Sequence, residues 1–298
     1  MAGMEHPGQA DATRWTTRRL LAWTAEHFTR RGIDSPRLSA EMLLAHVLGS
    51  TRLRLYIDPD RPATDLERAA FRELVERAAS HEPVDYLVGQ APFFSLLLKV
   101  SPSVLIPRPS TETIVAHVIE HARRNPGFRA PRIADVGTGS GAVAIALAKN
   151  MPESRIIATD ISPEALTLAG ENARACGVAE RLDLRQGDLL TPLAGERLHY
   201  LVSNPPYISD AEWAQVAPNV KDYEPVLALR GGSDGLKFLR PLIAQAALYL
   251  QRPGQLVLEI AASQKAAVLE LATAAGLANP RVLADHEALP RVLVADAP

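Results

Sequence analysis

Residues 133–141 read Ile-Ala-Asp-Val-Gly-Thr-Gly-Ser-Gly, and the fold can be predicted from this stretch outward. The run at 132–136 is typical of a buried strand and the alanine-rich run at 142–149 is typical of a helix, so the glycines form the turn between them. Glycine permits a sharp bend and a close approach of the backbone to a ligand, and the helix that follows offers free N–H groups. The stretch therefore predicts a binding loop for a nucleotide-like cofactor, with a glycine turn that holds no ligand as the alternative.

The same alternation of strand and helix continues to the end of the chain. Further strands are expected at 155–159, 181–185, 199–203, 255–260 and 291–296, and further helices at 163–175, 235–250 and 265–275. Strands that alternate with helices of these lengths form a mostly parallel, twisted sheet with helices on both faces. The fold class expected for this part of the chain is therefore α/β and Rossmann-like.

The residues before this α/β part show a different pattern. Helices are expected at 14–31, 36–48 and 64–80, the second of them started by the capping residue Ser35 and the proline that follows it. After residue 81, prolines are mixed with short β-prone runs, which predicts a hairpin with strands at 93–100 and 103–106. We therefore expect a small all-α domain at 1–80, a linker or β-hairpin at 81–110 and the α/β domain at 111–298.

Composition places the chain among ordinary globular proteins. Of its 298 residues 47% are hydrophobic, and 32 basic against 34 acidic residues give a net charge of -2, which argues against extended nucleic-acid binding. The single cysteine, Cys176, has no partner for a disulfide, and the eight histidines show no metal-ligand spacing. No apolar run is long enough to span a membrane, and Glu26 interrupts the run after Arg18 and Arg19 that an export signal needs. We expect a cytoplasmic monomer without a metal or a membrane anchor.

Acidic residues near the strand ends narrow the choice of cofactor. Ala142 completes the pattern Gly-x-Gly-x-x-Ala, so the loop by itself suits NAD as well as S-adenosylmethionine. Asp160 follows the second strand, where a carboxylate accepts hydrogen bonds from the ribose hydroxyls of either cofactor. Asp135 and Asp188 end the first and third strands, and carboxylates there attract a sulfonium or ammonium group but repel a pyrophosphate. The pattern favours S-adenosylmethionine, with a simple turn as the alternative role for Asp188.

Residues 201–207 read Leu-Val-Ser-Asn-Pro-Pro-Tyr, a rigid polar corner directly after an expected strand. Asn204 offers a side-chain carbonyl as acceptor, and Pro205 offers a main-chain carbonyl whose direction is restricted by the second proline. Two such acceptors can hold both N–H bonds of a planar NH2 group and turn its lone pair toward a methyl donor, and Tyr207 can stack on the planar group. The corner is therefore expected to be a template for an amide or an aromatic amine, with no metal and no covalent nucleophile.

Several motifs together resemble a known family. In order along the chain, DVGTGSGAVAIALA, IIATD and SNPPY are similar to class I S-adenosylmethionine-dependent methyltransferases that act on amide or amino nitrogen. The upstream segments SPRLSAEMLLAHVLG, EPVDYLVGQAPFF and LIPRPSTE extend the resemblance, over nearly the whole chain, to the HemK/PrmC family of release factor glutamine N5-methyltransferases. NPPY alone is moderately specific, because adenine-N6 DNA methyltransferases share it, whereas NPPY joined to LIPRPSTE is highly specific.

The resemblance implies a reaction and a set of site residues. The reaction is transfer of a methyl group from S-adenosylmethionine to the side-chain amide nitrogen, N5, of the glutamine in the Gly-Gly-Gln loop of class I peptide chain release factors. The cofactor would be held by Gly137, Thr138, Gly139, Ser140 and Gly141 at its methionine part, Asp160 at its ribose, Asp188 and Leu189 at its adenine, and Asn204 beside its sulfonium. The glutamine would be held by Asn204, Pro205, Pro206 and Tyr207, of which Asn204, Pro205 and Tyr207 would be catalytic.

Positions outside the main motifs add detail to the resemblance. Arg108 and Glu112 are expected to brace the cofactor loop, to shape the substrate channel or to serve the fold alone. Leu189 stands where the family often has an aromatic residue, which leaves adenine stacking there open. Ala261 and Ala288 stand where the family usually has glycine, which suggests a divergent branch or a changed loop near the substrate entrance.

Other functions stay open as alternatives. A related family that shares NPPY methylates a glutamine of a ribosomal protein, and adenine-N6 nucleic-acid methyltransferases share NPPY but need a target-recognition domain. An NAD-dependent oxidoreductase explains the glycine loop and Asp160 but gives NPPY no role. A non-catalytic module that binds S-adenosylmethionine and docks to translation factors is disfavoured by the intact Asn204 and Tyr207. In the favoured interpretation, the helical domain at 1–80 binds the body of the protein substrate.

Overall fold

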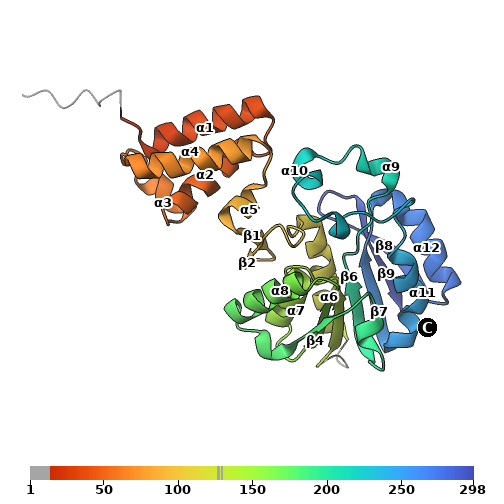
Figure 1. The fold of residues 1–298 in the computed structure, drawn as a ribbon. Helices are drawn as coiled ribbons and strands as arrows, with labels where there is room; N and C mark the ends of the chain where they lie inside the picture. The colour runs from red at the N-terminus through yellow and green to blue at the C-terminus, as the bar shows by residue number, and fades with distance from the viewer. Residues whose placement is uncertain (1–13, 126–127, 129) are drawn as a thin grey trace, which may run out of the picture. The chain divides into compact units, whose positions relative to one another are not determined.

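The computed structural model describes residues 14–125, 128 and 130–298, and the chain forms two compact units. Unit 1 comprises residues 1–88 and unit 2 comprises residues 89–298. The first thirteen residues of the all-α domain expected at 1–80 lie outside the described residues. Figure 1 shows unit 1 as helices in red and orange, and unit 2 as a sheet flanked by helices.

Unit 1 is a set of helices around one apolar core. Its helices are α1 (Thr17–Arg31), α2 (Pro36–Val47), α3 (Arg52–Ile57), α4 (Asp65–Ala79) and α5 (Val84–Val88). The buried side chains of Phe28, Leu43 and Phe71 belong to one cluster and come from α1, α2 and α4. At the start of α4, the Thr64 hydroxyl accepts a hydrogen bond from the Glu67 N–H and the Glu67 carboxylate accepts one from the Thr64 N–H. This reciprocal cap satisfies two N–H groups that would otherwise lack partners.

The expected helices of unit 1 are confirmed, with one correction. The side chain of Ser35 makes no capping hydrogen bond, so the proline at the first position of α2 marks the start of this helix without help from a cap. The helices α3 and α5 were not expected, because six and five residues are too few to show a helical period in the sequence.

Unit 2 is built on a seven-stranded sheet of order β5-β4-β3-β6-β7-β9-β8. Its strands are β3 (Arg132–Val136), β4 (Arg155–Asp160), β5 (Leu182–Gln186), β6 (Leu198–Ser203), β7 (Leu250–Glu259), β8 (Ala278–Ala284) and β9 (Pro290–Asp296). The pairs from β5 to β7 are parallel, and β9 and β8 are antiparallel to their neighbours. The expected mostly parallel sheet is confirmed. Because β6 lies beside β3 on the side away from β4, the strand order reverses at β3, and open α/β sheets bind ligands at such a point.

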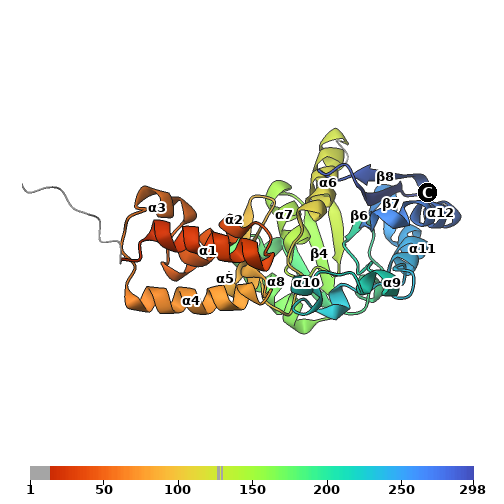
Figure 2. The same cartoon turned by 90° about the horizontal axis from the view of Figure 1, so that it is seen from above.

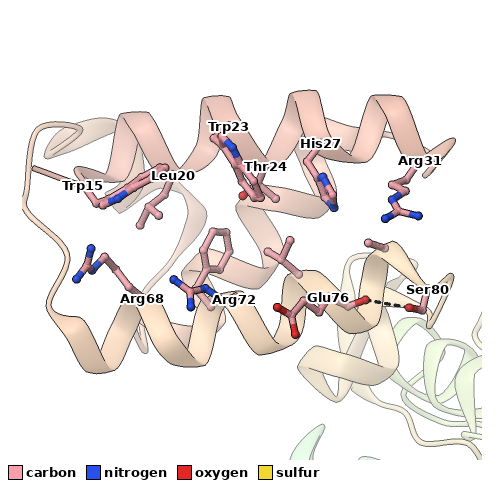
Figure 3. Close-up of a pocket in the computed structure, with 13 residues that line it drawn as sticks. Trp15, Leu20, Trp23, Thr24, His27, Arg31, Arg68, Arg72, Glu76 and Ser80 are labelled. Carbon is pink, nitrogen blue, oxygen red and sulfur yellow. Dashed lines mark hydrogen bonds between the residues drawn. The ribbon is translucent and has the colours of Figure 1, made fainter. Parts of the chain in front are cut away.

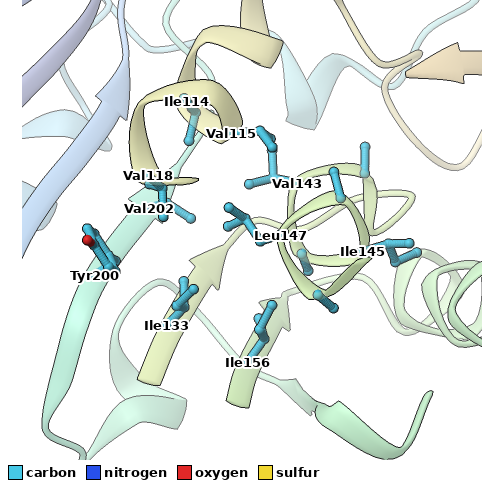
Figure 4. Packing of buried hydrophobic residues seen from close by; sticks show 14 of the residues in the cluster. Ile114, Val115, Val118, Ile133, Val143, Ile145, Leu147, Ile156, Tyr200 and Val202 are labelled. Atoms are coloured by element: carbon cyan, nitrogen blue, oxygen red, sulfur yellow. The ribbon is translucent and has the colours of Figure 1, made fainter. Parts of the chain in front are cut away.

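Helices cover both faces of this sheet (Figures 1 and 2). They are α6 (Glu112–Arg124), α7 (Ala142–Asn150), α8 (Pro163–Ala175), α11 (Leu239–Tyr249) and α12 (Lys265–Ala274), with the short helices α9 (Asp210–Trp213) and α10 (Pro218–Lys221) after β6. Neighbouring residues of β3 belong to opposite faces, since Ile133 packs with α6 and α7 while Ala134 packs with α11 and α12. Figure 4 shows Leu147 of α7 and Val118 of α6 on the same side of the sheet as Ile133. A sheet buried on both faces is a firm base for the loops at its edge.

The hairpin after unit 1 differs from the expected one. Its strands are β1 (Gln90–Phe93) and β2 (Leu96–Lys99), which pair antiparallel. Phe94 and Ser95 between them have φ of 46° and 62°, as a two-residue hairpin turn requires, so the segment 93–100 folds back on itself and is not one strand. Residues 103–106 form no strand, because the Ile106 N–H donates to the Glu224 carboxylate at 3.1 Å and the next residue is a proline.

Two of the longer elements of unit 2, α6 and β8, were missed from the sequence, as were the four-residue helices α9 and α10. Helix α6 carries a detectable signal, because its buried residues Ile114, Val115, Val118 and Ile119 recur at helical spacing. Strand β8 lies at the edge of the sheet, is mostly half-buried and shifts register against β9. Its residues therefore lack the regular alternation by which a half-buried strand is found.

Candidate active site

A cavity of about 260 Å³ lies in unit 2 where the strands β3, β4 and β6 end. The carboxyl ends of parallel strands meet at one edge of a sheet, and this cavity lies at the point where the strand order reverses. Loops that are far apart in the sequence meet in its wall. The expected site residues found there are Gly137, Gly139, Asp160, Asp188, Leu189, Asn204, Pro205 and Pro206.

The glycine loop after β3 is tied to the neighbouring strand β4. The N–H groups of Gly137 and Thr138 both donate to the Thr159 carbonyl, at 2.8 and 2.9 Å, and the Gly139 N–H donates to Oδ2 of Asp160 at 2.9 Å. Gly137 and Gly139 have φ of 72° and 56°, and a Cβ at either position would meet no other atom within 4 Å. Glycine is needed there for the backbone conformation, and the open space beside it is available to a ligand.

Other residues of the loop support it from behind and do not line the cavity. Thr138 donates its hydroxyl to buried Asp135, and the Ser140 carbonyl accepts a hydrogen bond from the Asn172 side chain at 2.9 Å. Gly141 has φ of 83° and precedes the first residue of α7. The structure thus divides the expected loop residues into two that border the cavity and three that fix their position.

Asp135 is buried beneath the loop, which corrects the expectation that it faces the cofactor. Its Oδ2 accepts hydrogen bonds from the Thr138 hydroxyl at 2.6 Å and from the Ala144 N–H at 3.2 Å. Burial raises the pKa of Asp135 to about 6, and the hydrogen bond from Thr138 opposes that rise. Asp135 therefore joins the loop to the first turn of α7 and is not in the cavity wall.

Asp160 lies at the end of β4 with both carboxylate oxygens anchored. Oδ1 accepts from the Ser162 N–H at 3.0 Å and Oδ2 from the Gly139 N–H at 2.9 Å. Each oxygen has a second lone pair, so each can also accept a bond from a hydroxyl in the cavity. Asp188 forms the turn that was its alternative role, since its main-chain carbonyl accepts hydrogen bonds from Thr191, and it also lines the cavity. The turn and a ligand contact are therefore compatible.

The corner after β6 places Asn204 in the cavity wall. The Ser203 hydroxyl donates to the Val136 carbonyl at 2.6 Å, which ties the end of β6 to the end of β3. Nδ2 of Asn204 donates to Oγ1 of Thr111 at 3.0 Å. No residue in the described ranges donates a hydrogen bond to Oδ1 of Asn204, which is the other end of the same amide. The corner therefore has the free acceptor that a template for an NH2 group requires.

Tyr207 is half-buried and does not line the cavity. Its hydroxyl donates to Oε1 of Glu259 at 3.4 Å, and its carbonyl accepts from the Gln264 side chain at 3.1 Å. Burial raises the pKa of the Tyr207 phenol above its usual value. A Cβ on Gly235 would lie 2.3 Å from the Tyr207 carbonyl oxygen, so the corner packs directly on a glycine. Tyr207 anchors the corner in this structure, and its stacking on a substrate stays a prediction.

Glu259, the last residue of β7, is a residue of this region that the sequence analysis missed. Its side chain is fully buried, and it accepts hydrogen bonds from the hydroxyls of Ser110 at 3.0 Å, Thr111 at 2.6 Å and Tyr207. Burial raises the pKa of the Glu259 carboxyl, and the hydrogen bonds oppose that rise. A glutamate inside the apolar run Leu-Val-Leu-Glu-Ile was the available signal, because a buried charge needs partners.

Arg108 and Glu112 have structural partners and do not line the cavity. The Arg108 guanidinium pairs with buried Glu224, which also accepts from the Ile106 N–H, so this pair fastens the segment that forms one wall of the cavity. The Glu112 carboxylate accepts from the Phe94 N–H at 2.7 Å and so fixes the turn of the hairpin. These contacts lie outside the loop at 137–141, so of the roles expected for Arg108 and Glu112 the one they support is a role in the fold alone.

The two alanines at usual glycine positions also lie outside the cavity wall. Ala261 has an ordinary backbone conformation, and its N–H donates at 3.0 Å to Gln264, the residue that holds the Tyr207 carbonyl. Ala288 has φ of 61°, a left-handed conformation that favours glycine, and its N–H donates to the Asp285 carbonyl at 3.0 Å. Ala261 therefore lies beside the residue that supports the corner, and Ala288 strains the backbone of a turn.

The walls of the cavity fit an S-adenosyl cofactor in their chemistry. Carboxylates from Asp160 and Asp188 suit hydroxyl and cationic groups, Leu189 gives an apolar surface, and the open space at Gly137 and Gly139 admits a ligand close to the backbone. The described residues contain no group of three or more His, Cys, Asp or Glu side chains that could hold a metal. None of the helices described here is long and apolar enough to cross a membrane.

Family models match both parts of the chain. The PrmC N-terminal domain model matches residues 19–89, and the methyltransferase small domain model matches residues 111–220. A release factor glutamine methyltransferase from Geobacter sulfurreducens is 40% identical over 94% of this chain and 96% of its own length. A release factor glutamine methyltransferase from Moorella thermoacetica is 43% identical over 94% of this chain and 98% of its own length.

Solved structures share the fold at low sequence identity. The human METTL16 catalytic domain in complex with a MAT2A 3'UTR hairpin is 14% identical, with a TM-score of 0.54 over 80% of this chain and 84% of that chain. The N-terminal domain of human METTL16 in complex with SAH is 15% identical, with a TM-score of 0.50 over 80% of this chain and 86% of that chain. These likenesses establish a Rossmann-like methyltransferase fold for the chain.

Proposed function

Because this chain belongs to the release factor glutamine methyltransferase family, we propose that it transfers the methyl group of S-adenosylmethionine to N5 of the glutamine in the Gly-Gly-Gln loop of class I peptide chain release factors. The observation that carries the proposal is the free Oδ1 of Asn204 at the edge of the cavity beside the glycine loop. An acceptor at that place suits an amide NH2 group that must face a methyl donor.

The cofactor is assigned to the cavity wall. Asp160 would accept hydrogen bonds from its ribose, Asp188 and Leu189 would lie at its adenine, and the loop at 137–141 would hold its methionine part. When bound, S-adenosylmethionine supplies a methyl group on a positively charged sulfur. Thr138, Ser140 and Asp135 contribute by fixing the loop and do not touch the ligand in this assignment.

The residues of the corner orient the substrate amide. Oδ1 of Asn204 and the carbonyl of Pro205 would accept hydrogen bonds from the two N–H groups of the substrate amide. This arrangement aims the nitrogen lone pair at the methyl carbon. The N–C bond forms as the S–C bond breaks, the sulfur is left neutral, and one N–H proton is released to water. Positioning of this kind corresponds to about 7–11 kcal/mol of the barrier in well-oriented reactions.

The proposal is tested by mass spectrometry. Purified protein is incubated with S-adenosylmethionine and an unmodified class I release factor, and the peptide that contains Gly-Gly-Gln is analysed. We expect one added methyl group on its glutamine. A gain on a glutamine of a ribosomal protein, or on adenine of a nucleic acid, in place of the release factor would contradict the proposal. Binding of S-adenosylmethionine with no transfer to any of these would indicate the non-catalytic module.

Unit 1 carries a groove that we assign to the body of the protein substrate. A cavity of about 600 Å³ lies between α1 and α4, and buried Phe71 is in its lining (Figure 3). The rings of Trp23 and His27, which also line it, are stacked with their centroids 5.1 Å apart. Arg31 and Arg72 also line it, and neither has an ion-pair partner in the described ranges of the chain. An aromatic surface with two unpaired cations suits an acidic segment that carries an apolar side chain.

Buried polar groups in the same groove add to this assignment. Oγ1 of Thr24 is buried, lines the groove and has no hydrogen-bond partner in the described structure. Nε of Arg68, another lining residue, is also buried and has no hydrogen-bond partner in the described structure. Buried polar atoms are nearly always satisfied in folded proteins, so these two atoms favour a groove whose polar contacts come from a partner.

Changes in this groove are expected to raise KM for the release factor without lowering kcat. Loss of an aromatic or arginine anchor at an interface typically costs about 2 kcal/mol or more, so Trp23→Ala and Arg72→Glu should each raise KM by at least about tenfold. The matched control is Arg30→Glu, since Arg30 is exposed and pairs with Glu26 outside the groove. Steady-state methylation at varied release factor concentration measures both constants, and an unchanged KM in both groove variants would refute this role.

A further inference from the structure

We propose that Glu259 determines, through Thr111, which end of the Asn204 amide faces the substrate, an inference that rests on the proposed role of the corner. Glu259 does not line the cavity and acts in this proposal as a positioning residue. Its effect passes through two hydrogen bonds, from Glu259 to Thr111 and from Thr111 to Asn204, and Asn204 does line the cavity.

The sheet brings the three residues together. The strands β6 and β7 are parallel neighbours, and Ser203 pairs with Leu258. Asn204 directly follows Ser203 at the end of β6, and Glu259 follows Leu258 as the last residue of β7. Thr111, which ends a short turn before α6, joins them, because its Oγ1 is 3.0 Å from Nδ2 of Asn204 and 2.6 Å from Oε2 of Glu259. Both Thr111 and Glu259 are buried, so the chain of bonds is made between protein atoms.

The polarity of this chain is fixed by its buried end. Hydrogen bonds from the Ser110, Thr111 and Tyr207 hydroxyls oppose the effect of burial and favour the ionised form of Glu259, which can only accept hydrogen bonds. The Thr111 hydroxyl therefore donates its single proton in the hydrogen bond to Glu259. A lone pair of the same oxygen is then what Thr111 presents to Asn204, and only the Nδ2 end of the amide can donate to it.

This polarity decides what the corner can bind. With Nδ2 held by Thr111, Oδ1 is the end available at the cavity, and it accepts from the NH2 group of a substrate amide. If the Asn204 amide were turned over, N–H groups would face the NH2 group, and two donors do not form a hydrogen bond. Glu259 thus selects the orientation of Asn204 that is productive for methyl transfer to an amide.

The first test uses two variants of Thr111: Thr111→Val replaces the hydroxyl with a methyl group, and Thr111→Ser keeps the hydroxyl and lacks the methyl group. Removal of an oriented catalytic group costs about 10²–10³ in kcat, and loss of its orienting partner should cost less, so we expect Thr111→Val to lower kcat about ten- to hundredfold. Thr111→Ser should keep most of the activity. Affinity for S-adenosylmethionine and KM for the release factor should change little in either variant.

The control is Ser110→Ala, because Ser110 also donates to Glu259 but has no contact with Asn204. This variant should retain kcat near that of the wild type. Equal losses in Ser110→Ala and Thr111→Val, or full activity in Thr111→Val, would overturn the proposal in favour of a general packing role for this region.

The second test asks whether Glu259 acts through Thr111. Glu259→Gln keeps the shape but can either accept or donate toward Thr111, so it should give a smaller loss of kcat than Thr111→Val. The double variant should be no worse than Thr111→Val alone, since one chain of bonds is broken in both. Losses that multiply in the double variant would show independent roles. If Glu259→Gln does not fold, the variants of Thr111 and Ser110 decide the question.

A measurement without substrate separates this proposal from the proposed function. In uniformly ¹⁵N-labelled protein, the side-chain amide signal of Asn204 is assigned by its absence in Asn204→Ala. Its hydrogen exchange should be slow in the wild type and in Thr111→Ser, and clearly faster in Thr111→Val. Equally fast exchange in all of them would overturn the chain of bonds, whether or not the protein methylates a release factor.

Discussion

Asn204→Ala is expected to lower kcat for release factor methylation by at least about 10²–10³, as removal of an oriented group from a transition-state site does. The variant lacks the Oδ1 acceptor, so one N–H bond of the substrate amide is no longer held and the nitrogen lone pair is free to turn away from the methyl carbon. The nitrogen also gains positive charge as the bond forms, which strengthens hydrogen bonds from its N–H groups. Single-turnover methylation followed by mass spectrometry measures the loss.

Two comparisons make this result specific. Asn204→Asp keeps an acceptor but cannot donate to Thr111, so its activity should lie between those of the wild type and Asn204→Ala. Asn150→Ala removes an asparagine at the end of α7, away from the cavity, and should leave kcat unchanged. The affinity for S-adenosylmethionine, measured by calorimetry, should stay measurable in all of them. Wild-type kcat in Asn204→Ala would exclude the corner as the template for the amide.

Asp160→Ala is expected to abolish cofactor binding at concentrations that saturate the wild type. A hydrogen bond to a charged group contributes about 1.5–3 kcal/mol, so loss of two bonds to the ribose should raise Kd by about two to four orders of magnitude. The variant also frees the Gly139 N–H, which donates to Oδ2 at 2.9 Å, and so loosens the glycine loop. Titration calorimetry with S-adenosylmethionine measures the change.

Control variants separate the ribose contact from the support of the loop. Asp160→Asn keeps one oxygen for Gly139 but loses the charge, so its affinity should fall between those of the wild type and Asp160→Ala. Asp183→Asn changes an aspartate of β5 that pairs with Arg185 and does not line the cavity, and it should bind normally. If Asp160→Ala binds S-adenosylmethionine as the wild type does, the cofactor does not occupy this cavity. Tight binding of NAD to the wild type would favour the oxidoreductase alternative.

Local sequence was sufficient to predict those parts of the candidate site that depend on local backbone conformation. The turn at 137–141 follows from its glycines, which have positive φ at both positions that border the cavity. Asp160 and Asn204 were found because Asp160 ends one strand and Asn204 directly follows another, and strands of a parallel sheet end at one edge. The cavity wall contains both residues, and its cofactor and substrate roles stay predictions.

Residues whose roles depend on distant partners were missed or misplaced. Thr111 and Glu259 meet Asn204 only because β6 and β7 are neighbours and α6 begins beside them. Asp135 looked like a ligand contact from its position near the glycines, but tertiary packing turns it into the interior. The contact of the Tyr207 hydroxyl with Glu259 was also missed, and stacking of Tyr207 on a substrate stays a prediction.

The α/β class, the loop at 137–141 and residues 160 and 204 beside the cavity could be predicted from local sequence, because each depends on backbone conformation over a few neighbouring residues. Which side chains turn inward, and which hydroxyl bonds to the Asn204 amide, could be seen only in the folded chain. The physical reason is that a hydrogen bond needs both partners within about 3 Å. Segments far apart in the chain reach that distance only when the sheet and its helices are assembled.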